Sequence, residues 1–84
     1  MAWTVIGDTR LTKAQGLKIR LKGGADEIIR IPSTCKYLVA QTPNMMDQKS
    51  NRLEIGIWDS TGEWTAIAVF VGGTWENVVP FYEQ

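Results

Sequence analysis

Apolar and basic residues alternate without interruption from Leu17 to Lys22, where the sequence reads Leu-Lys-Ile-Arg-Leu-Lys. Such alternation is typical of a half-buried β-strand, because successive side chains of a strand point to opposite faces. Gly23 and Gly24 follow, and the segment 27–31 is again rich in isoleucine. The pattern predicts a β-hairpin with one apolar face and one basic face.

The two faces of this hairpin constrain its loop. The apolar side chains of the first strand meet Ile29 and Ile31 only if the loop has an odd number of residues, because cross-strand partners share a face. The simplest such loop is the Gly-Gly-Ala segment 23–25, with a glycine at positive φ. The basic side chains then share the opposite face: Lys18, Arg20, Lys22 and Arg30.

Shorter signals surround this hairpin. The segment 36–41 reads as another strand after Pro32. The polar segment 42–51 is either a loop or a single helical turn that begins at Thr42-Pro43. Upstream, the segment 9–16 predicts a short turn that ends at Gly16.

The last third of the chain predicts a three-stranded meander. Strands are expected at 53–58, 64–71 and 74–79, and the middle one is apolar on both faces, as a central strand should be. Gly72-Gly73 predicts a two-residue hairpin turn of the primed type. Pro80 is expected to end the last strand.

A five-residue loop after Trp58 sorts the side chains of this meander by type. One face is then aliphatic, and the other is aromatic. The aliphatic face carries Leu53, Ile55, Ile57, Ile67, Val69, Val71 and Val78; the aromatic face carries Trp58, Trp64, Phe70 and Trp75. Each ring covers about 150–250 Å², so four rings exceed the roughly 300–600 Å² of the largest apolar patch on a typical monomer. Either the N-terminal strands or a partner should therefore cover the aromatic face.

The length and composition indicate one small globular domain. The 84 residues are 44% hydrophobic and 21% charged, and the single cysteine has no partner for an intrachain disulfide. We therefore expect residues 1–84 to form a single all-β domain. The expected architecture is a small antiparallel sandwich or partly open barrel of five to seven short strands, with the meander at its C-terminal end.

Charge is distributed unevenly along the chain. Residues 1–52 carry nine bases and four acids, a net charge of +5, whereas residues 53–84 carry five acids and no base, a net charge of −5. One interpretation is intramolecular, with a basic hairpin beside an acidic meander. The other is head-to-tail association, in which the basic end of one subunit meets the acidic end of the next.

The composition excludes several kinds of catalytic site. Histidine is absent, so neither a Ser/His/Asp nor a Cys/His nucleophile system is available, and a Cys/His zinc site cannot form in one chain. The paired glycines lack the lysine and the helix of a phosphate loop. We expect a protein that is not an enzyme and that carries no metal and no cofactor.

The favoured function is that of a structural or assembly protein that forms a homo-oligomer or docks on a larger scaffold. An accessory component of a virus particle, such as a capsid decoration or tail protein, is one form of this hypothesis. The first alternative is a carbohydrate-binding module that uses the tryptophan-lined face together with Asn77. The second is a small β-barrel that binds single-stranded nucleic acid, although the neutral charge of the domain disfavours it.

The expected location is the cytoplasm, or the virion for a viral protein. The N-terminal residues lack the basic and apolar regions of a signal peptide. No apolar run approaches the ~20 residues of a membrane helix. A membrane partner is therefore not expected.

Overall fold

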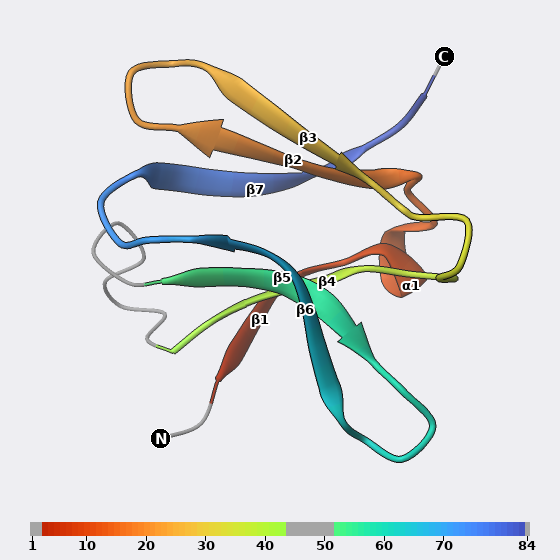
Figure 1. Cartoon of the computed structure of the whole chain (residues 1–84). Helices are drawn as coiled ribbons and strands as arrows, with labels where there is room; N and C mark the ends of the chain where they lie inside the picture. Colours follow the sequence, from red (N-terminus) through yellow and green to blue (C-terminus); the bar gives the residue numbers. More distant parts are fainter. Residues whose placement is uncertain (1–2, 44–51, 84) are drawn as a thin grey trace.

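Seven strands form two antiparallel sheets that face each other in the computed structural model, which describes residues 3–43 and 52–83 (Figure 1). The first sheet has the strand order β1-β4-β5-β6, and the second has the order β3-β2-β7. The elements are β1 (Thr4–Asp8), α1 (Thr9–Thr12), β2 (Gly16–Leu21), β3 (Asp26–Arg30), β4 (Val39–Thr42), β5 (Leu53–Trp58), β6 (Trp64–Phe70) and β7 (Trp75–Phe81). The predicted all-β class and the predicted number of strands are confirmed.

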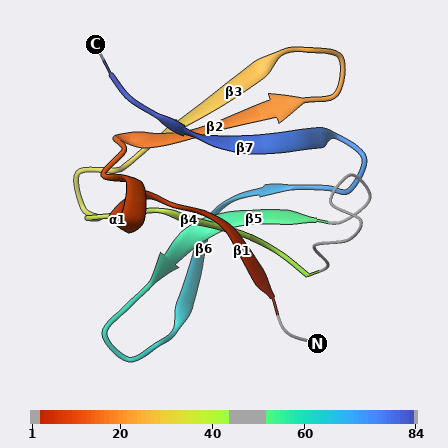
Figure 2. The same cartoon turned by 180° about the vertical axis from the view of Figure 1, so that it is seen from behind.

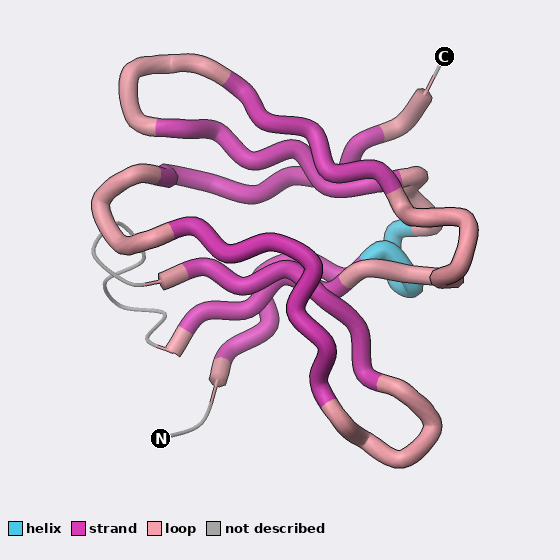
Figure 3. Tube along the Cα trace, viewed as in Figure 1, coloured by secondary structure: helices cyan, strands magenta, loops and turns pink. Residues whose placement is uncertain are grey.

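The hydrophobic core lies between the two sheets and takes side chains from both. Its buried members are Leu17, Ile19, Leu38, Ala40, Leu53, Ile55, Trp75 and Val78. The chain crosses between the sheets at α1, which follows β1 and precedes β2 (Figure 2). The loop end of the β5–β6 hairpin extends away from the second sheet (Figure 3).

The β2–β3 hairpin confirms the prediction of an odd loop and shared faces. Leu17 lies opposite Ile29, and Arg20 lies opposite Asp26. The loop has three residues but begins one residue earlier than expected, because the Leu21 amide donates to the Ala25 carbonyl at 2.7 Å. Both glycines of the loop have positive φ.

The β5–β6 hairpin has the predicted five-residue loop and the predicted pair Trp58–Trp64. A register shift follows, because Gly56 lies opposite Ala66 whereas Ile55 lies opposite Ala68. Ile67 is therefore the extra residue of a β-bulge. The bulge moves the next residues of β6 to the other face of the sheet, so the predicted aliphatic and aromatic faces do not form.

The predicted three-stranded meander is wrong. The strand β7 leaves β6 and pairs with β2, so that Trp75 lies opposite Leu21 in the second sheet. The turn before it is not of the primed type, because Gly73 has φ 86° and Gly72 does not have a positive φ. In a two-residue loop, a turn of the unprimed types would splay the flanking strands and so disfavours a hairpin between β6 and β7.

Other segments differ in detail from the prediction. Pro80 lies inside β7 opposite Leu17, which is compatible with the edge position of this strand. The helical turn α1 ends at Thr12 and is followed by the C-cap Lys13, whose φ is 55°, whereas Gly16 begins β2. The predicted helical turn within 42–51 falls almost entirely outside the described residues, and Thr42 ends β4. No helix in residues 3–43 and 52–83 has the length and apolar character needed to cross a membrane.

The bulge gives a test of the register in the β5–β6 hairpin. A Cβ on Gly56 would lie 2.1 Å from the Thr65 carbonyl oxygen, which is backbone and cannot move aside. We expect Gly56→Ala to lower the free energy of unfolding by about 1–3 kcal/mol, measured by urea denaturation. The exposed control Thr65→Ala should change it by less than about 0.5 kcal/mol. Unchanged stability of Gly56→Ala would contradict this close approach.

Candidate functional site

Two tryptophans lie together on the outer face of the first sheet. The rings of Trp58 and Trp64 are 5.1 Å apart between centroids and are tilted by 57°. Both side chains are half-buried. They meet because the five-residue loop places them directly opposite each other at the end of the hairpin. Of the four aromatic residues predicted to share a face, the structure brings only these two together.

The loop beside this tryptophan pair is closed by the Asp59 carboxylate. Its Oδ1 atom accepts hydrogen bonds from the Thr61 hydroxyl at 2.6 Å, from the Thr61 amide at 2.9 Å and from the Glu63 amide at 3.0 Å. These bonds, above all the one from the Thr61 side chain, lower the pKa of Asp59. Asp59 is therefore a charged turn residue and is not poised as a proton donor.

Charged side chains link the tryptophan pair to Trp3, the residue before β1. The Trp64 indole donates from Nε1 to Glu54 Oε1 at 2.8 Å. The other oxygen of Glu54 lies 3.0 Å from Arg52 Nη2, and the Arg52 guanidinium lies 5.4 Å from the centroid of the Trp3 ring. Aromatic and charged groups thus alternate across the outer face of this sheet. The Trp64 indole N–H group is hydrogen-bonded to Glu54 and so is not free to bind a ligand.

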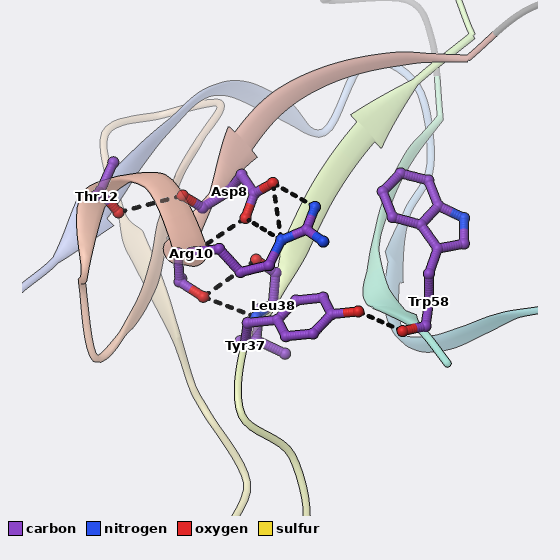
Figure 4. Close-up of polar contacts among 7 residues, drawn as sticks. Asp8, Arg10, Thr12, Tyr37, Leu38 and Trp58 are labelled. Atoms are coloured by element: carbon purple, nitrogen blue, oxygen red, sulfur yellow. Dashed lines mark hydrogen bonds and ion pairs between the residues drawn. The ribbon is translucent and has the colours of Figure 1, made fainter. Parts of the chain in front are cut away.

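A polar cluster formed by Asp8, Arg10 and Tyr37 reaches the backbone of Trp58 (Figure 4). The Arg10 guanidinium donates to both carboxylate oxygens of Asp8, the shortest contact being 2.7 Å. It also lies 4.4 Å from the centroid of the Tyr37 ring. The Tyr37 hydroxyl donates to the Trp58 carbonyl oxygen. Asp8, Arg10 and Tyr37 therefore connect the start of α1 to the end of β5.

The start of α1 is bound to the segment before β4 by Thr9. The Leu38 amide donates to Thr9 Oγ1 at 2.8 Å, and the Thr9 amide donates to the Leu38 carbonyl at 3.0 Å. Both residues are buried. Asp8 also caps α1, since its Oδ1 accepts from the Arg10 amide at 2.9 Å. The polar groups of Asp8, Thr9 and Arg10 thus bond to one another or to the Leu38 backbone. We therefore assign these residues a structural role at the start of α1.

Phe70 and Trp75 do not belong to the tryptophan pair, which corrects the expectation of a four-ring face. Trp75 has no exposed surface and is the largest fully buried side chain. Phe70 is half-buried against the same core. The bulge at Ile67 turned Phe70 inward, and the crossing of β7 carried Trp75 into the second sheet. Their role is to fill the core.

The predicted basic residues do gather on the outer face of the second sheet, with Lys22 in the adjoining loop. Two of them are already paired: Arg20 lies 3.5 Å from Asp26, and Arg30 lies 3.2 Å from Glu83. The Arg30 guanidinium also lies 5.4 Å from the centroid of the Phe81 ring. A shallow polar hollow on this face is lined by Lys18, Arg20, Asp26, Asn77 and Val79. Asn77 is therefore on the opposite sheet from the tryptophan pair.

The third surface is the free edge of the first sheet at β6. Three apolar side chains in or directly after this strand, which we call the β6 edge triad, are exposed: Ile67 at the bulge is 40% exposed, Val69 is 50% exposed, and Val71, which follows the end of β6, is 62% exposed. The strand Trp64–Phe70 contains neither a charged residue nor a proline. Such strands offer unpaired backbone groups to another chain. This surface was missed from the sequence because β6 was expected in the centre of a meander.

The polar cluster was also missed, although it carries a local signal. Asp8 directly precedes Thr9, and an aspartate before a helical turn is a common N-cap. By contrast, the contact between Arg10 and Tyr37 joins residues far apart in the sequence and has no local signature. In the described part of the chain, no group of three or more Cys, Asp or Glu side chains is placed to hold a metal ion.

The Asp8–Arg10 pair gives a prediction with a defined pH dependence. Arg10 lowers the pKa of Asp8 chiefly through its side-chain hydrogen bonds. The stabilisation is therefore complete above the unfolded-state pKa of about 3.9 and is lost as the pH falls through the lower folded-state pKa. We expect Asp8→Ala to lower the free energy of unfolding by about 0.5–2 kcal/mol at pH 7, measured by urea denaturation.

The control is Asp8→Asn, which keeps an N-cap acceptor but removes the charge. It should cost less than Asp8→Ala at pH 7, and its difference from the wild type should shrink below about pH 4. A difference between wild type and Asp8→Asn that stays the same from pH 7 to pH 3 would show that the charge of Asp8 contributes nothing.

Comparisons with known proteins do not assign these surfaces. The chain matches no protein-family model, no curated protein and no solved structure.

Proposed function

We propose that this protein is a non-enzymatic assembly protein, which acts by binding copies of itself or by docking on a larger scaffold. The observation that carries the proposal is the β6 edge triad. It combines an unpaired strand edge with three exposed apolar side chains in an uncharged segment. An accessory role on a virus particle, as a capsid decoration or tail component, is one form of the same proposal.

Two physical properties of this edge favour a protein partner. Its backbone offers hydrogen bonds in a regular array, which another strand satisfies by pairing with it. Its side chains are β-branched and apolar, so a partner that covers them removes apolar area from water at about 25 cal/mol per Å². A small ligand would leave most of this edge exposed.

The glycan alternative receives less support from the tryptophan pair. The two rings are tilted by 57° and do not form one flat platform for a sugar ring. The Trp64 N–H group is bonded to Glu54, and Asn77 lies on the other sheet. The nucleic-acid alternative also receives less support, because Arg20 and Arg30 are paired with carboxylates.

Light scattering tests the assembly proposal directly. At micromolar concentration the mass should be several times the 9.4 kDa of one chain. Titration of sugar panels, followed by tryptophan fluorescence, should give no response. A mass of 9.4 kDa throughout the concentration range, together with a saturable sugar response, would replace the assembly function with the glycan alternative.

A further inference from the structure

We propose that the shallow hollow on the outer face of the second sheet binds one phosphate group, either as free phosphate or as part of a small phosphomonoester. This site is separate from the β6 edge, which belongs to the other sheet. Its lining residues come from all three strands of the second sheet, with β2 in the centre: Lys18, Arg20, Asp26, Asn77 and Val79.

The strand register explains why these side chains meet. They belong to two neighbouring rows of cross-strand partners, Ile28–Lys18–Val79 and Asp26–Arg20–Asn77. Cross-strand partners share a face of the sheet, and so do residues two apart in one strand. The Cα atoms of Lys18 and Arg20 are therefore roughly 7 Å apart, at about 3.3 Å per residue. Two side chains of this length can reach a single group that lies between them.

The hollow carries two positive charges and only one negative charge. Arg20 contacts Asp26 through Nε, which lies 3.5 Å from Oδ1, a distance beyond the usual range of a hydrogen bond. The Lys18 ammonium group has neither an ion pair nor a hydrogen bond to any residue in the described part of the chain. Like charges on one face of a sheet repel each other, so an anion between Lys18 and Arg20 is favoured.

The Asn77 side chain adds uncharged donors to the hollow. Its Oδ1 atom accepts a hydrogen bond from the Val78 amide at 2.9 Å, so the Nδ2 group remains to donate. Lys18, Arg20 and Asn77 thus offer N–H groups from three directions. A phosphate group has at least three acceptor oxygens that point in different directions and can accept from all three side chains, whereas a carboxylate has only two oxygens.

The size of the hollow fits a single group of this kind. Its volume is about 70 Å³, and one water molecule needs about 10–15 Å³ of such space, so the hollow holds roughly five water-sized atoms. An inorganic phosphate ion has this number of heavy atoms. Val79, which is 36% exposed, supplies an apolar wall, and apolar walls strengthen the attraction between charges in a hollow.

A nucleic-acid strand is a less suitable ligand for the same face. Its backbone needs a continuous groove of available cations, but Arg30 is paired with Glu83 at 3.2 Å. Asp26 would also repel the next phosphate of a strand. The chemistry therefore favours one isolated phosphate group.

The first test is a titration with inorganic phosphate at constant pH and ionic strength, followed by ¹⁵N–¹H NMR. Exposed ionic contacts are weak, so we expect a dissociation constant of about 1–10 mM. The Asn77 side-chain amide and the backbone amides of Lys18 and Arg20 should shift together and saturate. The absence of a saturable shift at these residues up to about 100 mM phosphate would overturn the proposal.

The second test removes the unpaired cation. Lys18→Gln should weaken phosphate binding at least about threefold. The matched control Lys36→Gln removes the same charge at an exposed residue outside the hollow, and it should bind phosphate like the wild type. Circular dichroism checks that both variants fold. Equal weakening by the two substitutions would show that only the net charge matters, which contradicts a site at the hollow.

The third test has the opposite sign. Asp26→Asn removes the one negative charge of the hollow and releases Arg20, so it should tighten phosphate binding about two- to threefold. Glu27→Gln is its control, because the next side chain of β3 points to the other face of the sheet. Binding that weakens or stays unchanged in Asp26→Asn would contradict the assigned role of Arg20.

The fourth test identifies the form of the ligand. Glycerol 3-phosphate that shifts the same signals with similar affinity indicates a phosphomonoester site, whereas a response to inorganic phosphate alone indicates a site for the free ion. Acetate should shift these signals much less at the same concentration. Acetate binding as strong as that of phosphate would show that the hollow does not select a phosphate group.

Discussion

The burial of Trp75 between the two sheets is the interaction on which the rest of the structure depends. Trp75 is the largest side chain of the core with no exposed surface, and burying so large an apolar ring is strongly favourable. It reaches this position because β7 leaves the first sheet and pairs with β2. The same crossing makes β6 an edge. The core of the monomer and its candidate interaction surface therefore have one origin.

The two outer faces of the sandwich differ in chemistry, and each is held by its own contacts. The face of the first sheet carries the tryptophan pair, in which the Trp64 indole donates to Glu54 and the Trp58 carbonyl oxygen accepts from the Tyr37 hydroxyl. The face of the second sheet carries the basic residues, of which Arg20 and Arg30 are paired with nearby acids. The charge division seen in the sequence is thus partly balanced within one molecule.

Much of the local structure could be predicted because its signals are local. The alternation in β2 identified the strand and its basic face, and the five residues after Trp58 identified a hairpin loop that pairs Trp58 with Trp64. The bulge at Ile67 has no such signal. One extra residue reverses the faces of everything that follows it, so Phe70 was placed on the wrong side.

The sequence by itself determined the all-β class, most of the strands and their turns, because alternation and turn chemistry act within a few residues. Only the tertiary structure decided which strands pair. Gly72-Gly73 suits either a hairpin or a crossing, and the choice depends on how much apolar surface each arrangement buries across the whole domain. For this reason the position of Trp75, and with it the free edge of β6, could be known only from the folded chain.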